Sequence, residues 1–193
     1  MKGMSIDRRE LIVEAATKSF SLFGYKATTM DQVAKLANVG KGTIYTFFKN
    51  KDELFQEIVY SMVREMKSSA DLAIHPDNSF YENVDEALIT LLEYRTEHQL
   101  MLKLIEEEKQ IGTRAVEEML HHIENELVAY VKSKIDRAME SGQIKPCDTE
   151  IISFILLKVY ISLVSDWERN HPPLSSEKIA AIMEDYLLKG LST

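Results

Sequence analysis

Hydrophobic residues in the first part of the chain recur at the spacing of an α-helix. Between Ile6 and Phe23 they return every three or four positions, which predicts an amphipathic helix. Asp7 is a plausible cap near its start, and Gly24 stands where helices commonly stop. The chain therefore opens with one helix of about five turns.

A second, shorter helical pattern follows at once. Thr28 or Thr29 is placed to cap this helix. Asp31 or Gln32 stands where a capping box has its second partner. The expected inner face consists of small and apolar residues: Met30, Val33, Ala34 and Ala37. Residues 38–40, Asn-Val-Gly, then predict a turn, because Asn and Gly tolerate positive φ.

A third helix is expected over about residues 41–47, ending near Lys49 and Asn50. A fourth starts around Lys51 and ends before Pro76. Two short helices joined by a tight turn and braced by a longer first helix are typical of a helix-turn-helix. The second helix of such a pair is small enough to enter the major groove of DNA.

The rest of the chain keeps the helical pattern. We expect five further helices, at about residues 81–97, 99–110, 113–141, 148–169 and 175–190. No segment of convincing length alternates with period two, so the fold is predicted to be all-α.

Two of these helices predict contact with a second copy of the chain. The helix at about 148–169 is apolar on nearly every side and needs contacts on more than one side. The helix at about 175–190 carries an apolar stripe: Ile179, Ile182, Tyr186 and Leu187. We expect both helices to pair with their counterparts in a homodimer.

The distribution of charge separates the two parts of the chain. The formal net charge is −8, yet residues 1–51 hold nine Lys/Arg and four Asp/Glu, a charge of +5. The remainder therefore carries −13, which indicates a basic binding module joined to an acidic body. We place the DNA-binding domain at residues 1–52 and the helical body at 53–193, linked through the fourth helix at about 51–73.

Neither a leader nor a membrane segment is expected from this sequence. No N-terminal stretch has the pattern of a signal peptide. The most apolar run, 151–164, is interrupted by polar residues and is too short to span a bilayer. Cys147 stands alone, which fits a reducing compartment. These features predict a cytoplasmic protein with no membrane partner.

The third helix offers several groups that suit DNA. A lysine adds charge, a glycine lets a phosphate backbone come close, hydroxyls can hydrogen-bond, and rings can meet thymine methyls. The residues concerned are Lys41, Gly42, Thr43, Tyr45, Thr46, Phe47 and, opening the next helix, Lys51. The alternative is that the aromatic residues belong to the core. We accept that for Phe48 and leave it open for Tyr45 and Phe47.

The block from Leu11 to Leu54 resembles the tetracycline-repressor (TetR) family of bacterial transcription regulators. Within it, GYKATTMDQVAKLANV is similar to the family's first turn and second helix, and GKGTIYTFFKNKDEL to its recognition helix. The resemblance implies a three-helix N-terminal DNA-binding domain followed by an all-helical domain for ligand binding and dimerisation. It also implies a homodimer that reads a palindromic operator in double-stranded DNA. It also adds Thr29 to the expected DNA contacts. Gly40 departs from a frequent Ser at that position, and Phe47 from a frequent His or Tyr.

Chemistry other than DNA binding has weaker signals. Three histidines (98, 121 and 122) and the acidic run 106–108 invite a metal site, but the HExxH arrangement of zinc enzymes is absent. We expect the acidic run to be a solvated face. No phosphate-binding loop, nucleophile elbow or catalytic cysteine context is found. We therefore expect no catalytic residues, no metal and no cofactor.

A ligand pocket is expected in the body, lined by aromatic, Met and His residues and by one lysine. The candidates are Tyr94, Met101, Met119, His122, Tyr130, Phe154, Lys158 and Trp167. Lys158 is a cation within an apolar helix, where an unpaired charge is costly. It could meet a carboxylate of its own subunit, reach water at a rim, or bind an anionic ligand head group.

Together these features predict a ligand-responsive transcriptional regulator rather than an enzyme. The expected mode is a repressor that binds its operator as a homodimer and is released by a small, largely hydrophobic effector. Two other hypotheses remain: a small helical metal-assisted enzyme, and a DNA-binding scaffold without an effector.

Overall fold

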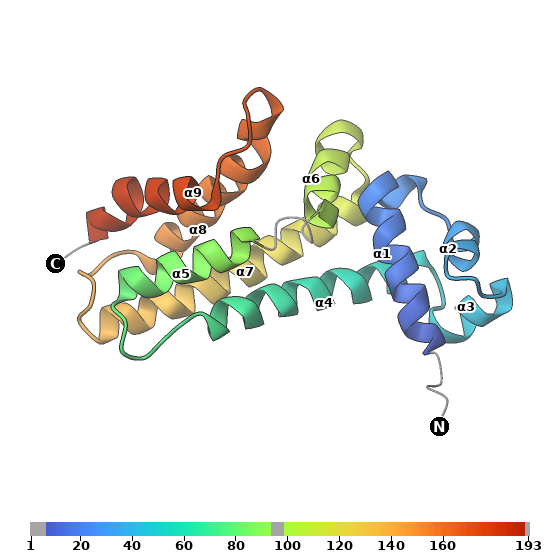
Figure 1. Ribbon diagram of the computed structural model, residues 1–193, viewed down its shortest axis with the longest axis horizontal. Coiled ribbons are helices and arrows are strands. Elements are labelled where there is room, and N and C mark those ends of the chain that lie inside the picture. The colour runs from blue at the N-terminus through green and yellow to red at the C-terminus, as the bar shows by residue number, and fades with distance from the viewer. Residues whose placement is uncertain (1–6, 94–98, 192–193) are drawn as a thin grey trace. The chain divides into compact units, whose positions relative to one another are not determined.

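The computed structural model describes residues 7–93 and 99–191, and the regular elements in this part of the chain are all helices (Figure 1). Their bounds are α1 Arg8–Ala27, α2 Met30–Leu36, α3 Lys41–Phe47, α4 Lys51–Leu72, α5 Phe80–Glu93, α6 Gln99–Ile111, α7 Arg114–Glu140, α8 Thr149–Ile161 and α9 Ser176–Met183. The described residues contain no β-strand. The all-α prediction is confirmed.

The last two helices continue beyond their α-helical parts with a different winding. α8 is followed by a π-helical turn, Ser162–Asp166, and a 3-10 turn, Trp167–Arg169. α9 continues in the same way through Glu184–Leu188 and Lys189–Leu191. The expected long helices are thus present, but only their first parts are regular α-helix.

The described residues form two compact units. The first comprises residues 7–64 and 99–121, and the second comprises 65–93 and 122–191. α4 and α7 each contribute residues to both units. The predicted division at residue 53 would put α6 with the body, whereas in the structure α6 packs against α1 in the first unit.

α1 has the predicted start and the predicted break. The Asp7 side chain accepts hydrogen bonds from the backbone N–H groups of Arg9 (2.9 Å) and Glu10 (3.4 Å). Gly24 adopts φ 81° and ψ 173°, so the regular helix is interrupted there. A left-handed φ of this kind is readily adopted only by glycine.

α2 and α3 form the short pair expected from the sequence. Thr29 and Gln32 make the capping box, with each side chain bonded to the other's backbone N–H at 3.3 and 2.9 Å. The turn before α3 contains Asn38 at φ 53°. α1 contacts both short helices, which contact each other. The core of this unit includes Phe20 and Phe55, whose rings meet edge to face at 5.4 Å.

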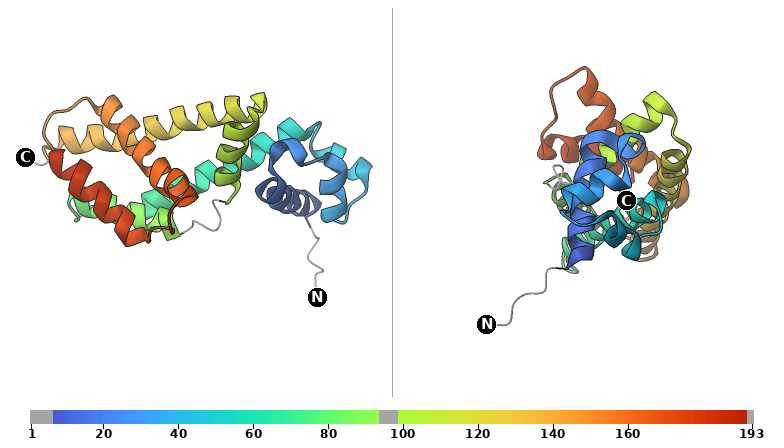
Figure 2. Two further views of the ribbon diagram at one scale, coloured as in Figure 1. Left: turned by 90° about the horizontal axis from the view of Figure 1, so that it is seen from above. Right: turned by 90° about the vertical axis from the view of Figure 1, so that its right-hand side faces the viewer.

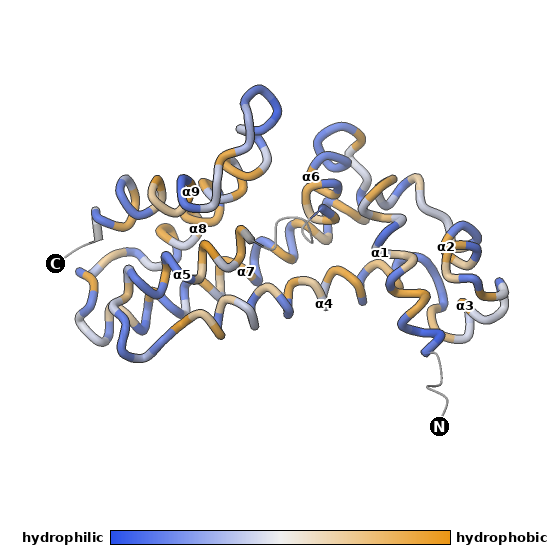
Figure 3. The backbone as a smooth tube through the Cα atoms, in the orientation of Figure 1, coloured by the Kyte–Doolittle hydropathy of each residue, from blue (hydrophilic) through white to orange (hydrophobic). Residues whose placement is uncertain are grey.

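The second unit has a core built by α5, the C-terminal part of α7, α8 and α9. Figure 2 shows α9 beside α5, and the two helices are in contact. Hydrophobic residues recur along these helices with hydrophilic residues between them, as the colouring in Figure 3 shows. The buried cluster consists of Phe80, Leu92, Ile135, Ala138, Ile144, Leu156, Val164, Ile179, Met183 and Leu188. None of the described helices is both long enough and apolar enough to cross a bilayer.

Candidate nucleic-acid interface and ligand cavity

α3 divides its residues between the core of the first unit and its surface. Ile44 and Phe48 are fully or almost fully buried. Tyr45 and Phe47, by contrast, are 45% and 39% exposed. The core alternative is therefore correct for Phe48 and does not describe Tyr45 or Phe47. Two aromatic side chains in solvent are available to a partner.

The first turn of α3 is also open. The Lys41 side chain is two-thirds exposed and pairs with Asp31 at 2.9 Å. The hydrogen bond from Lys41 to that carboxylate raises the pKa of the lysine. A Cβ built on Gly42 would find no atom within 4 Å, so the glycine is not required by packing. Thr46 donates its hydroxyl hydrogen to the carbonyl of Thr43 at 2.6 Å.

Lys51 and Thr29 already have roles inside the folded unit. The Lys51 ammonium donates to the backbone carbonyls of Tyr25 (2.8 Å) and Thr28 (3.0 Å) and lies 4.0 Å from the Tyr25 ring centre. Burial lowers the pKa of Lys51. Since an ammonium has three hydrogens, one remains for a phosphate. Thr29, as described above, caps α2.

The acidic run 106–108 contains a buried carboxylate. Glu107 is only 4% exposed, so the expectation of a solvated face is wrong for this residue. Its two oxygens accept the backbone N–H of Lys26 at 3.0 and 3.3 Å. The sequence pattern could not show this contact, because the partner lies on α1, far away in the chain.

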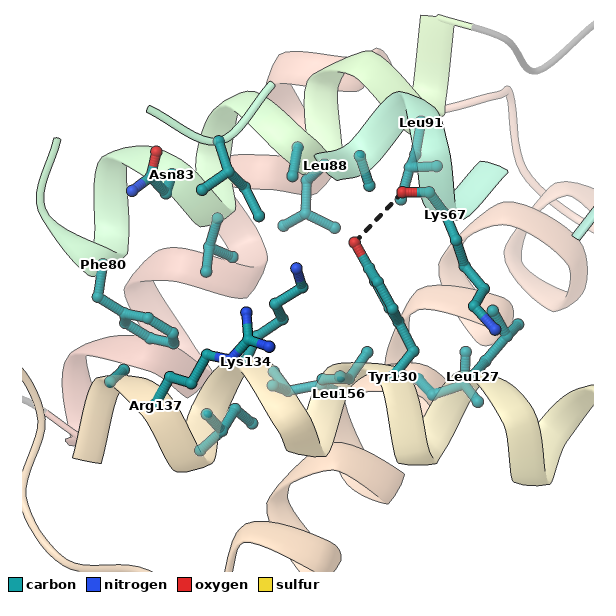
Figure 4. A pocket seen from close by; sticks show the side chains of 18 of the residues that line it. Lys67, Phe80, Asn83, Leu88, Leu91, Leu127, Tyr130, Lys134, Arg137 and Leu156 are labelled. Carbon is teal, nitrogen blue, oxygen red and sulfur yellow. Dashed lines mark hydrogen bonds between the residues drawn. The ribbon is translucent and has the colours of Figure 1, made fainter. Parts of the chain in front are cut away.

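The second unit contains a cavity of about 490 Å³ (Figure 4). Pockets for small molecules in proteins usually have volumes of about 300–1,000 Å³. Its wall is mostly apolar and comes from α4, α5, α7, α8 and α9. The apolar residues of the wall are Met66, Ala70, Ile74, Phe80, Val84, Ala87, Leu88, Leu91, Leu127, Val131, Ile135, Ala138, Leu156, Leu157 and Met183. The cavity has the size and the lining of a small-molecule site.

Three cationic side chains also line this cavity: Lys67, Lys134 and Arg137. Lys134 and Arg137 both rise from α7 into the space below α5 in Figure 4. Asp71 of α4 accepts hydrogen bonds from Lys134 and from the Tyr130 hydroxyl (2.7 Å). Burial opposes ionisation of Asp71, but these hydrogen bonds outweigh it and hold its pKa below the ordinary value.

Of the eight residues expected to line a pocket, Tyr130 does so. Tyr94 lies outside the described residues. The other six lie away from the wall of the cavity: Met101, Met119, His122, Phe154, Lys158 and Trp167. Lys158 pairs with Glu124 of its own subunit at 2.6 Å, which is the first of the three alternatives raised by the sequence.

Lys134 and Arg137 were missed, although the sequence holds a signal for them. Together with Tyr130 they stand at steps of four and three residues, which places them on one face of a helix. Which face of that helix borders a cavity depends on packing between distant segments. Among the described residues, no group of three His, Cys, Asp or Glu side chains is placed to hold a metal ion.

Comparison with known proteins decides the family. Residues 12–58 match the model of the bacterial regulatory proteins of the tetR family, and residues 77–191 match the tetracyclin repressor-like C-terminal domain. The chain belongs to the TetR family. This TetR-family chain is 58% identical to the uncharacterized HTH-type transcriptional regulator YhgD of Bacillus subtilis (strain 168), over 98% of this chain and 99% of the relative.

Two solved structures share the fold. The fatty acid degradation regulator FadR from Bacillus halodurans superposes with a TM-score of 0.76 at 15% identity, covering 97% of this chain and 98% of that chain. A complex of SmeT with triclosan gives a TM-score of 0.78 at 18% identity, covering 96% and 92%. Because the chain belongs to the TetR family, it is a transcriptional regulator and not an enzyme.

Proposed function

We propose that this chain is a repressor that binds a palindromic operator as a homodimer and releases it when a small, largely hydrophobic effector fills the cavity. The observation that carries the proposal is the cavity of about 490 Å³ in the second unit. Its wall includes residues of α4 and α7, and both helices also contribute to the unit that holds the helix-turn-helix.

The DNA-binding role is assigned to residues 1–52, with α3 in the major groove. The proposed contacts are those expected from the sequence: Thr29, Lys41, Gly42, Thr43, Tyr45, Thr46, Phe47 and Lys51. Exposure of Tyr45 and Phe47 and the open space beside Gly42 support the assignment. Lys51 contributes at most the one hydrogen that its two carbonyl partners leave unused.

α4 offers a route from effector to DNA. Met66, Lys67 and Ala70 of this helix line the cavity, while its residues 51–64 belong to the DNA-binding unit. A ligand that changes the position of α4 changes the separation of the two recognition helices in the dimer. Those helices must lie about 34–36 Å apart to enter successive major grooves, so a small change weakens operator binding.

The dimer is assigned to the outer faces of α8 and α9. On α8, Ile151, Phe154 and Ile155 are exposed, although they are large and apolar. Beyond α9, Tyr186 is 80% exposed. The stripe expected from the sequence is only partly outward, because Ile179 is fully buried in the core of its own unit.

The family supports repression, and the cavity supports an effector. The C-terminal family model is named for a repressor, and SmeT, a protein of the same fold, has been solved with a small molecule. A scaffold without an effector would have its core filled by side chains, whereas here a cavity is open. The two other hypotheses from the sequence therefore have less support than an effector-controlled repressor.

A gel-shift titration with the DNA upstream of the protein's own gene tests the DNA-binding role. We expect one complex that contains two chains, and scrambled DNA of the same length is the control. Equal affinity for both DNAs would contradict the proposal.

Sedimentation of a Phe154→Glu chain tests the dimer, with Leu72→Glu as the control because Leu72 is exposed but lies on α4. We expect monomers for Phe154→Glu and dimers for Leu72→Glu and for the unmodified chain. A Phe154→Glu chain that remains dimeric would contradict the assigned interface.

A further inference from the structure

The cavity carries positive charge in a chain that is negative overall. Its described lining includes three cationic residues and neither Asp nor Glu, whereas the whole chain has a net charge of −8. A cation beside an apolar wall costs free energy unless an anion is near. Each of the three cations therefore needs a partner.

Two of these cations pair with acidic residues that do not line the cavity. Lys67 pairs with Glu126 at 3.6 Å. Lys134 pairs with Asp71, whose carboxylate also accepts the Tyr130 hydroxyl. Neither acid is among the residues that line the cavity. The charges of Lys67 and Lys134 are therefore balanced without a ligand.

Arg137 is different. Among the described residues, no salt bridge joins its guanidinium to a carboxylate, although its charge acts on Asp71 and helps to lower the pKa of that acid. Figure 4 shows its side chain pointing into the cavity near that of Lys134. Asp71, Lys134 and Arg137 together leave one positive charge in excess. A guanidinium has five N–H donors in a planar fork that matches the two oxygens of a carboxylate.

Neighbouring polar groups of the wall are already used. The Asn83 amide accepts the N–H of His75 at 2.7 Å and donates to the carbonyl of His75 at 3.0 Å. Gln143 donates to Ser141 (3.0 Å), and Ser141 donates to the carbonyl of Ala138 (3.1 Å). Arg137 thus has hydrogen-bond donors to offer where these neighbours do not.

We propose that the cavity binds a single-chain amphiphile with one carboxylate head group, which meets Arg137 while its hydrocarbon tail lies along the apolar wall. One excess positive charge favours a single negative charge over two. The inference deepens the proposed function, on which it rests for the view that the cavity is the effector site. It specifies the chemical class that the effector belongs to.

The probes are five compounds: dodecanoate, dodecyl phosphate, dodecanol, dodecyltrimethylammonium and hexanoate. Four share one tail and differ in head group, and hexanoate keeps the carboxylate with half the tail. Titration calorimetry with the full chain, below the micelle concentration of each compound, should give one dodecanoate per chain. A charged hydrogen bond is worth a factor of about 10–100, so dodecanol should bind that much more weakly. The ammonium compound and hexanoate should bind too weakly to measure.

Three variants examine the head-group site. Arg137→Gln should weaken dodecanoate binding about 10- to 100-fold and leave dodecanol binding unchanged. Asp71→Asn removes the competing negative charge and should tighten dodecanoate binding. Lys132→Gln is the control: it removes one charge from the same helix, but Lys132 lies outside the wall of the cavity. It should leave both affinities unchanged.

Several results would overturn the inference: dodecanol binding as tightly as dodecanoate, dodecyl phosphate binding more tightly than dodecanoate, or Arg137→Gln binding dodecanoate normally. None of these measurements involves DNA. The proposed function is tested separately by adding dodecanoate to the operator complex. Binding of dodecanoate without release of DNA would contradict the proposed function and leave the ligand class standing, whereas DNA binding without affinity for dodecanoate would do the reverse.

Discussion

The carboxylate of Glu107 on α6 accepts the backbone N–H of Lys26, 81 positions earlier in the chain, at 3.0 Å. This contact lies where α1 is interrupted at Gly24, so the carboxylate supplies an acceptor to a backbone N–H beside the interruption. A Cβ on Gly24 would stand 2.3 Å from Oε2 of Glu107. The glycine thus permits both the backbone turn and the close approach of the carboxylate.

Gly24→Ala should therefore destabilise the first unit by two separate effects. The positive φ strains any side chain, at a cost of about 1–3 kcal/mol. The new methyl group also displaces Glu107, whose lost charged hydrogen bond adds about 1.5–3 kcal/mol. Urea unfolding of the first unit measures the total loss in its free energy of unfolding.

Gly112→Ala is the matched control, because Gly112 has φ 65° but a Cβ there would meet nothing within 4 Å. Gly112→Ala should lower the free energy of unfolding only by the cost of backbone strain. In a Glu107→Ala background, Gly24→Ala should cost less than it does in the unmodified chain, because no carboxylate is left to be displaced. Equal costs for the two glycine substitutions in the unmodified chain would show that the contact with Glu107 contributes nothing.

The helix-turn-helix could be predicted from the sequence because its determinants are local. The caps at Asp7 and Thr29, the break at Gly24 and the turn at Asn38 each depend on residues within a few positions of each other. The buried Glu107 and the cationic wall could not be predicted in this way. Glu107 stands in a run of acids that resembles a solvated face, and only its contact with α1 distinguishes it. Arg137 lines the cavity only because distant segments pack beside its helix, and the local sequence pattern does not contain that information.

The pair of Asp71 and Lys134 makes the stability of the second unit depend on pH. The pKa of Asp71 is lower in the folded chain than its ordinary value of 3.8. Its contribution to stability is thus complete above the ordinary pKa and is lost as the pH falls through the lowered value. The unmodified chain should be more stable than Asp71→Asn at neutral pH; this difference should begin to shrink as the pH falls below about 4 and should disappear below the lowered pKa.

Thermal unfolding of both chains between pH 2 and 7 measures this difference. Asp77→Asn is the control, since Asp77 is exposed and forms no ion pair with a described residue. A difference between the unmodified chain and Asp71→Asn that stayed constant over the whole range would contradict the role of the ion pair.

Lys41 and Lys51 should respond differently to removal of their charge. Lys41 is exposed, so Lys41→Ala should leave stability unchanged and remove one phosphate contact from each chain of the dimer. The slope of the logarithm of the operator-binding constant against the logarithm of the salt concentration should then become smaller by about 2.

Lys51→Ala should also lower stability, because the carbonyls of Tyr25 and Thr28 lose their donor. Fluorescence anisotropy with operator DNA at several salt concentrations, together with thermal unfolding, separates the two residues. A Lys51→Ala chain of unchanged stability would argue against its place in the fold, and an unchanged salt slope for Lys41→Ala would argue against its phosphate contact.

Gly42 allows DNA binding to be tested with little risk to the fold. It lies within α3 at a negative φ, and a Cβ there would meet nothing within 4 Å. Alanine favours the helix by about 1 kcal/mol over glycine, so Gly42→Ala should leave the free protein as stable as before or slightly more stable. If the DNA backbone approaches this turn closely, the same methyl group must collide with it. Operator affinity should then fall at least about tenfold, which corresponds to about 1.4 kcal/mol. Anisotropy titration and thermal unfolding of one preparation give both quantities. An affinity that did not change would place the DNA elsewhere on α3, since the folded protein itself offers nothing for the added methyl group to touch.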